Sequence, residues 1–274
     1  MKILVCIKQV PDYDTVLSSD WTVDNNTLWI DYANRIANCF DDYALECALR
    51  FMGKYNNTGD PCDIHILSIG DSSVDRLLKN YLAYEVSSVT RIAYGHSENN
   101  APYIIAKLIS LYIEKTGLPD IIMMGCQSGV YDYGQTPLYT AEILGIRCIT
   151  HMTSLDFDES DPNRIYIQHN TKGSKEQIQV MQPIVVTVGD IENTALRSCT
   201  LKEKLAAKNR KINIVSLDAL KYEPFDGYNQ KTLREIQNVE QTKRCEMLRV
   251  DSTQQAVKII KDEINAVQGV NTVE

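Results

Sequence analysis

The sequence has few of the residues that build metal centres, and it spaces them far apart. Its eight cysteines are scattered between Cys6 and Cys245, and none forms the closely spaced pair typical of zinc and thioredoxin-like redox motifs. The four histidines, at positions 65, 96, 151 and 169, are equally dispersed. We therefore expect no metal site, and we expect the cysteines to be structural, since a reduced thiol packs as a small apolar group.

An excess of positive charge and a long hydrophobic run are also missing. The net charge of −8 argues against nucleic-acid binding, which needs a basic surface to neutralise phosphates. No apolar stretch approaches the length of a membrane span. The opening MKILVCIKQV is interrupted by Lys8, so it is typical of a first strand rather than of a secretion signal. These features predict a cytoplasmic protein with no membrane insertion and no nucleic-acid partner.

Apolar runs alternate with amphipathic segments over the first 145 residues. Strands are predicted at 3–7, 63–69, 88–93 and 121–124, and helices at 41–54, 73–84, 101–115 and 135–144. This alternation predicts an α/β fold, a parallel sheet with helices on both faces. Ligands of such sheets bind outside the carboxyl ends of the strands, so the segments that follow the strands should converge there.

The pattern changes after residue 145. Residues 148–155, 164–170 and 176–181 predict a small antiparallel addition, and 183–188 a further buried strand. Beyond Gly189 the chain is polar and irregular to about residue 250, and a closing amphipathic helix follows at about 253–267. We expect a domain of residues 1–190 and an extended C-terminal arm of residues 191–274.

The most informative segment is the loop 125–137, with the sequence GCQSGVYDYGQTP. It joins a predicted strand to a helix whose first turn contains Pro137, an arrangement that points main-chain N–H groups at a bound anion. The amides of Gln135 and Thr136, with the Thr136 hydroxyl, suit phosphate oxygens, whereas Asp132 would repel a phosphate and suits a ribose hydroxyl or the bracing of the loop. The loop therefore predicts a nucleotide site. The alternative is that Gly134 only permits a tight turn.

Four blocks of the sequence resemble the β subunit of electron-transfer flavoproteins. They are VCIKQVPD at 5–12, NCFDDYALECAL at 38–49, GCQSGVYDYGQTPLYTAEILG at 125–145 and EQIQVMQPIVVTV at 176–188. Their order and spacing extend the resemblance over the whole chain. The resemblance implies a Rossmann-like fold of the adenine nucleotide α-hydrolase type and a partner, the α subunit, that carries a redox FAD.

The resemblance also implies a bound nucleotide in this chain, either AMP or a second FAD. By position, the contacts would come from Cys6, Lys8, Asn38, Ile69, Asp132, Gly134, Gln135 and Thr136. Lys8 is equally well explained as a solvated charge at a strand end. The segment by which family members recognise a client dehydrogenase would include Asn193, Thr194, Ala195 and Leu196. Asn193 stands where a leucine is common, which argues against the usual acyl-CoA dehydrogenase client.

Three functions are compatible with these residues. The favoured one is a non-catalytic subunit that relays electrons between the α subunit and a dehydrogenase. An alternative is an electron-bifurcating member whose β subunit holds a redox FAD and accepts hydride from NADH. The third is a stand-alone nucleotide-binding module, although KQVPD at 8–12 replaces the serine-glycine phosphate loop of its ATP-cleaving relatives. No nucleophile and base are placed by spacing, so no catalytic residue is assigned.

Overall fold

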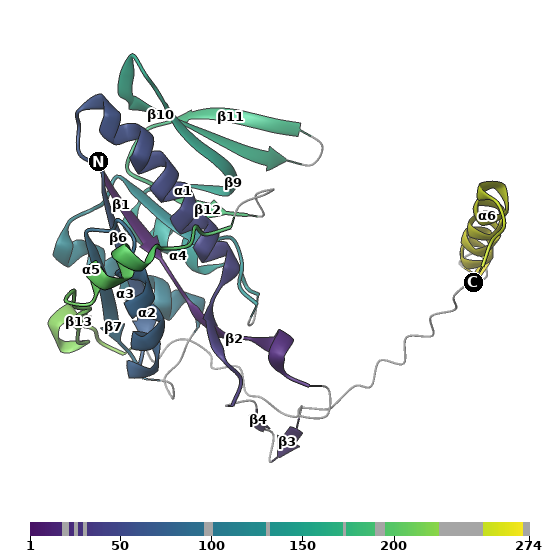
Figure 1. Cartoon of the computed structure of the whole chain (residues 1–274), viewed down its shortest axis with the longest axis horizontal. Coiled ribbons are helices and arrows are strands. Elements are labelled where there is room, and N and C mark those ends of the chain that lie inside the picture. The colour runs from purple at the N-terminus through teal and green to yellow at the C-terminus, as the bar shows by residue number, and fades with distance from the viewer. Residues whose placement is uncertain are drawn as a thin grey trace. The chain divides into compact units, whose positions relative to one another are not determined.

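The structure of the chain is a computed structural model, shown in Figure 1. It describes residues 1–17, 22–24, 27–29, 32–95, 101–129, 132–171, 174–189, 195–224 and 249–270. The chain divides into two compact units, Met1–Arg234 and Glu235–Glu274, each of which is described by itself. The division predicted at residue 190 remains a prediction.

The first unit is built on a nine-stranded sheet in the order β11-β10-β9-β12-β8-β1-β6-β7-β13. The pairs from β9 to β13 across this order are all parallel. The inner strands are β1 (Lys2–Cys6), β6 (Asp63–Gly70), β7 (Ser88–Ala93), β8 (Ile121–Gly125) and β12 (Ile184–Val188). The predicted Rossmann-like α/β fold is confirmed.

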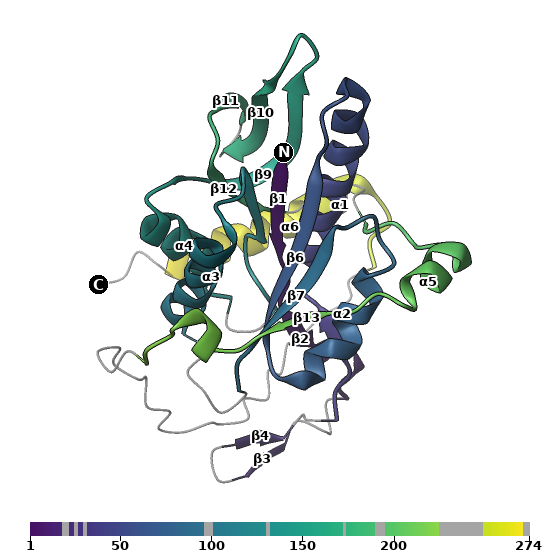
Figure 2. The same cartoon turned by 90° about the vertical axis from the view of Figure 1, so that its left-hand side faces the viewer.

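Helices cover both faces of the sheet, as Figure 2 shows. On one face lie α1 (Cys39–Tyr55) and α2 (Asp75–Tyr81), and on the other α3 (Pro102–Thr116) and α4 (Thr136–Leu144). Alternate residues of β1 enter the two cores, Ile3 and Val5 packing with α1 and Leu4 packing with α3. Because both faces are buried, the strands are continuous apolar runs, which is why the sequence revealed them.

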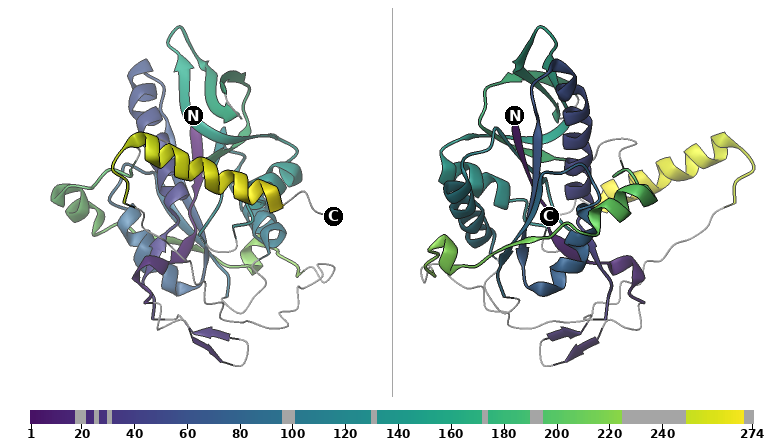
Figure 3. Two further views of the ribbon diagram at one scale, coloured as in Figure 1. Left: turned by 90° about the vertical axis from the view of Figure 1, so that its right-hand side faces the viewer. Right: turned by 60° about the vertical axis from the view of Figure 1, so that its left-hand side comes forward.

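The predicted antiparallel addition is confirmed. It consists of β9 (Arg147–Asp158), β10 (Asp161–Thr171) and β11 (Ser174–Val180), and both views of Figure 3 show it extending the sheet at one corner. The start of β9 pairs in parallel with β12, and its later residues pair with β10 in antiparallel register. One long strand thus joins the two parts of the sheet.

Several short elements were not predicted. Two small antiparallel ribbons pair β2 (Gln9–Pro11) with β5 (Arg35–Ala37), and β3 (Thr22–Asp24) with β4 (Thr27–Trp29). The expectation of irregular chain from 190 to 250 is wrong for α5 (Leu201–Ala207) and for β13 (Asn213–Val215), which adds to the edge of β7. Single 3-10 turns occupy Tyr13–Thr15, Asn56–Thr58, Ser72–Val74 and Asp218–Leu220. These elements are too short for a clear hydrophobic period.

The second unit contains α6 (Thr253–Val270), which confirms the predicted closing helix. The first turn is held by the Ser252 hydroxyl, which accepts from the N–H of Gln255 at 3.2 Å. Val257, Ile260 and Ile264 expose half or more of their surface within this unit. Much of the predicted arm, residues 225–248, lies outside the described residues.

Candidate functional site

The strand order reverses between β1 and β8. The chain leaves β1 for β6 and β7 on one side, then returns through α3 to place β8 on the other side. At such a switch point the connections leave in opposite directions, which opens a crevice at the carboxyl ends of the two strands. The segments after Cys6 and after Met124 therefore border the candidate site.

The ribbon of β2 and β5 returns the chain to this crevice. Gln9 pairs with Ala37, so the residue that follows the ribbon, Asn38, lies beside Lys8. The N–H of Asn38 donates to the carbonyl oxygen of Lys8 at 2.9 Å. The Asn38 side chain is almost fully buried, and its amide donates across the crevice to the carbonyl of Gln127 at 2.9 Å. Two predicted site residues far apart in sequence are thus neighbours.

Asp41 joins the ends of the two strands. Its Oδ2 accepts from the N–H of Lys8 at 2.8 Å and its Oδ1 accepts from the N–H of Gly125 at 2.8 Å. Burial raises the pKa of this carboxyl to about 7, against hydrogen bonds from Lys8, Gly125 and Asn38 that favour the ionised form. The sequence analysis placed Asp41 only at the start of a helix and missed this role.

Gly125, the last residue of β8, permits this close approach. A Cβ at position 125 would lie 2.5 Å from Asp41 Oδ1 and 2.7 Å from the Cβ of Phe40. Any side chain would therefore force α1 away from the strand end. A glycine directly after an apolar run was the available sequence signal, but its reason became visible only in the structure.

The loop that follows β8 leads to the amino end of α4. Asp132 and Gly134 have positive φ angles of 41° and 60°, and a Cβ on Gly134 would lie 2.9 Å from the carbonyl oxygen of Cys126. Gln135 is the N-cap of α4, Thr136 its first residue and Pro137 its second, as expected. Within the described residues, no hydrogen bond engages the N–H of Gln135 or Thr136. These amides suit a phosphate group.

The ammonium of Lys8 contacts this loop. It donates to the hydroxyl of Ser128 at 3.0 Å, which brings the segment after β1 against the segment after β8. Partial burial lowers the pKa of Lys8, and the charge of Asp41 opposes that change. Lys8 is thus an exposed residue whose ammonium reaches from the segment after β1 to the loop after β8.

Cys6 and Ile69 line the crevice from the strands. Cys6 is the last residue of β1, and burial, with a contribution from Asp41, raises the pKa of its thiol, so it stays protonated at neutral pH. Ile69 is the next-to-last residue of β6 and packs against the core beneath α3. Both residues are uncharged and lie at strand ends on the carboxyl edge of the sheet.

The predicted docking residues are only partly described. Asn193 and Thr194 lie outside the described residues. Ala195 is exposed, whereas Leu196 packs against the core beneath α1. Sequence reasoning missed Leu201 and Leu205, one turn apart on α5, which are 74% and 61% exposed. An exposed leucine has no sequence signature, so only the structure reveals this apolar surface.

Arg197 fastens this segment to α1. The guanidinium of Arg197 donates twice to the carboxylate of Glu46, from Nε at 3.0 Å and from Nη2 at 3.0 Å. The main-chain N–H of Arg197 donates to the same carboxylate at 3.1 Å. Hydrogen bonds from Arg197 and Arg50 lower the pKa of Glu46 despite the burial that raises it. After α5, Arg210 donates to the carbonyls of Leu82, Tyr84 and Val86. The segment is therefore held at both ends.

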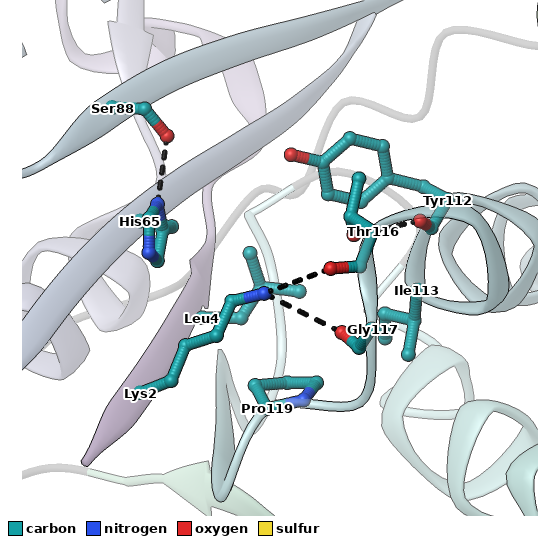
Figure 4. Close-up of a pocket in the computed structure, with 9 residues that line it drawn as sticks. All are labelled: Lys2, Leu4, His65, Ser88, Tyr112, Ile113, Thr116, Gly117 and Pro119. Atoms are coloured by element: carbon teal, nitrogen blue, oxygen red, sulfur yellow. Dashed lines mark hydrogen bonds between the residues drawn. The ribbon is translucent and has the colours of Figure 1, made fainter.

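A cavity of about 190 Å³ lies at the opposite, amino edge of the sheet (Figure 4). There the ammonium of Lys2 donates to the carbonyls of Thr116 and Gly117 at the end of α3, and His65 bonds with Ser88 at 2.8 Å. Burial lowers the pKa of His65, so the ring is neutral at pH 7. Lys2 therefore stabilises the end of α3, and none of the predicted nucleotide contacts lines this cavity.

The described residues also bear on metal binding and on membrane insertion. Among them, no group of three or more His, Cys, Asp or Glu side chains is arranged to hold a metal ion. None of the described helices is long and apolar enough to cross a membrane.

Comparison with known proteins assigns the chain to a family. The family model described as "Electron transfer flavoprotein domain" matches residues 27–220, well over half of the chain. The chain belongs to the electron transfer flavoprotein family. The match includes Asn38, Gly125 and the loop to α4, and it confirms the resemblance found in the sequence.

Relatives of this electron transfer flavoprotein chain cover most of its length at low identity. A probable electron transfer flavoprotein subunit beta of Saccharomyces cerevisiae is 26% identical over 96% of this chain and 96% of its own. The subunit beta of Methylophilus methylotrophus is 22% identical over 95% and 97%. The acryloyl-CoA reductase electron transfer subunit gamma of Anaerotignum propionicum is 24% identical over 82% and 81%. The chain is thus an electron-transfer subunit of the β type.

Proposed function

We propose that this chain is the β subunit of a heterodimeric electron transfer flavoprotein that binds an adenine nucleotide between β1 and β8. Its partner would be an α subunit that carries the redox FAD, and the pair would relay electrons to or from a dehydrogenase. The observation that carries the proposal is the convergence of Lys8, Asn38 and the loop after Gly125 at the switch point. These residues come from three separate segments of the sequence.

The chemistry of the site fits an adenylate group. The amides of Gln135 and Thr136 open α4, where the helix dipole favours negative charge, and the ammonium of Lys8 reaches the same loop. The positive φ of Gly134 lets the loop turn toward this helix end. Cys6 and Ile69 supply uncharged strand-end surface for the nucleoside. AMP and FAD present the same adenylate to these residues.

The residues of this chain would bind and position, and none is assigned a chemical step. A flavin held in the assembled protein supplies electron uptake and release. The chain's own contribution is a rigid support, since α1 packs on β1, β6, β8 and β12 and carries Asn38 and Asp41 at its start. A second redox FAD, with NADH as donor, is the electron-bifurcating version of the same site.

The decisive experiment is co-expression of the full chain with an α subunit, followed by extraction of the bound nucleotides and identification by mass. We expect a yellow heterodimer with one FAD and one AMP. Two FAD per heterodimer would instead identify the bifurcating version. A colourless monomer that carries no adenine nucleotide and ignores the α subunit would refute the proposal, and ATP hydrolysis by that monomer would favour the stand-alone module.

We further propose that a dehydrogenase docks on the segment from Ala195 to Leu205. Leu201 and Leu205 form its exposed apolar centre. Lys202 and Lys204 lie between them in the sequence of α5, with Glu203, and Lys208 follows the helix, on a chain that is acidic overall. Such a surface suits a partner with an apolar pocket and an acidic rim. The helix itself is set by Thr200 and Glu203, which cap each other at its start.

Leu201→Ala tests the docking surface. The variant should keep its thermal stability, because the side chain is 74% exposed, and it should lower the rate of electron transfer with the client dehydrogenase about tenfold. Leu118→Ala is a matched control, an exposed leucine at the amino edge that should change neither quantity. Equal rates of electron transfer for the two variants would show that the dehydrogenase does not dock on this segment.

A further inference from the structure

The carboxylate of Asp41 occupies two main-chain donors at the carboxyl edge of the sheet. Lys8 lies two residues beyond β1 and Gly125 is the last residue of β8, and the N–H of each donates to a separate oxygen of this carboxylate at 2.8 Å. The side chain is buried, with 5% of the residue exposed. An anion that enters the crevice therefore finds these two donors already used.

The groups around Asp41 add little positive charge. Burial raises the pKa values of Cys6 and Cys126, which stay neutral, and Asp42 on the next position of α1 is a further carboxyl. Tyr81, with a pKa raised by burial and by Asp42, also stays neutral. Lys8 is the cation of this group, and its ammonium is directed at Ser128 in the loop that leads to α4. The crevice thus has an acidic end, where Asp41 holds the strand ends, and a basic end, where the ammonium of Lys8 meets the loop before α4.

We infer that Asp41 sets the direction in which a nucleotide lies in the crevice. Its carboxylate keeps phosphate away from the ends of β1 and β8, so that the phosphate binds at Lys8, Gln135 and Thr136 and the uncharged nucleoside lies toward the strand ends. The inference rests on the proposed function, because it assigns an orientation to the nucleotide of that same site. Asp41 is a positioning residue and contacts no reacting atom.

Asp41→Asn tests the inference, with Asp42→Asn as the matched control. An asparagine keeps the size of the side chain, removes its charge and accepts one main-chain N–H instead of two. The control residue is the adjacent carboxyl, which accepts from the Tyr81 hydroxyl and holds neither strand end. The full chain, freed of co-purifying nucleotide, is titrated calorimetrically at pH 8, above the pKa of Asp41, with adenosine, with AMP and with inorganic phosphate.

We expect Asp41→Asn to bind inorganic phosphate about tenfold more tightly than the natural chain, because repulsion is lost and a donor is released. Its affinity for adenosine should change less than about threefold, and Asp42→Asn should match the natural chain for every ligand. An Asp41→Asn chain with weaker adenosine and AMP binding, a lower melting temperature and unchanged phosphate binding would overturn the inference, because that pattern reflects structural damage alone.

A second variant covers the case in which Asp41→Asn does not fold. Thr136→Val removes the hydroxyl at the start of α4 and should weaken AMP about fivefold while leaving adenosine unchanged. Unchanged AMP affinity in Thr136→Val would overturn the orientation. A natural chain that binds neither AMP nor FAD would refute the proposed function, whereas a natural chain that binds AMP with no phosphate gain in Asp41→Asn would refute only the role of Asp41.

Discussion

At the amino edge of the sheet the ammonium of Lys2 donates to the last carbonyls of α3, while at the carboxyl edge Lys8 donates to a serine in the loop before α4. Lys2 is the first residue of β1, and Lys8 lies two residues beyond the other end of that strand. The difference follows from connectivity, because helices that link parallel strands end at the amino edge and begin at the carboxyl edge. The amino edge therefore collects carbonyl groups, and the carboxyl edge collects N–H groups that attract anions.

The largest effect is expected where the carboxyl edge is packed most closely. Gly125→Ala should destabilise the first unit by roughly 3 kcal/mol and abolish nucleotide binding, because the new Cβ would lie 2.5 Å from Asp41 Oδ1. Gly117→Ala, at the amino edge, has no atom within 4 Å of its Cβ but a φ of 93°. It should cost about 1 kcal/mol and keep the nucleotide. Denaturant unfolding of both variants measures the loss of stability, and extraction measures the nucleotide that each retains. Equal losses of stability in the two variants would contradict the difference between the edges.

The buried carboxyl at the carboxyl edge predicts a dependence of stability on pH. The pKa of Asp41 is about 7 in the folded chain and near 3.8 when unfolded. The folded state therefore favours the protonated form, and the contribution of Asp41 to stability is complete below about pH 4 and is lost as the pH rises to about 7. The loss should be at most roughly 4 kcal/mol.

The measurement is chemical denaturation between pH 4 and pH 8, with Asp41→Asn as the comparison. Subtracting the two curves isolates Asp41 from the other groups that titrate in this range, among them Glu46, whose lowered pKa has the opposite sign: its contribution is present above its unfolded pKa and is lost as the pH falls. A difference curve that is flat over this range would show that Asp41 keeps an ordinary pKa.

The smallest effect on stability, and the sharpest contrast between the edges, is expected from the two lysines. Lys8→Met should lower nucleotide affinity about tenfold and change stability by less than about 1 kcal/mol. Lys2→Met should leave affinity unchanged and cost about 0.5 kcal/mol, because it removes a cation from the end of α3. Calorimetric titration with AMP and thermal unfolding measure both. Equal affinity losses would show that Lys8 acts only through overall charge.

The elements that the sequence predicted well are those with a strong local signal. The inner strands are apolar runs because both faces are buried, and α1 and α3 carry long apolar stripes. The strand β13 gave no such signal, since its three residues form a strand only by pairing with the edge of β7. The helix α5 was missed because two of its leucines face outward.

The candidate site was predicted in part for the same reason. The loop from Gly125 to Pro137 could be interpreted from its glycines, its hydroxyl groups and the helix that follows it. Asp41 was placed at a helix start, where acidic residues are common, and nothing local distinguished it from Asp42. The partners of its carboxylate, Lys8 and Gly125, lie 33 and 84 residues away in the chain.

The sequence by itself determined the alternation of strands and helices, the start of α4 after a glycine-containing loop and the family, because each depends on residues close together in the chain. The tertiary structure alone decided which strand ends meet, that one carboxylate holds both of them, and which leucines remain exposed. Those features depend on distances between segments joined by long connections, and side-chain chemistry along a chain does not encode such distances locally.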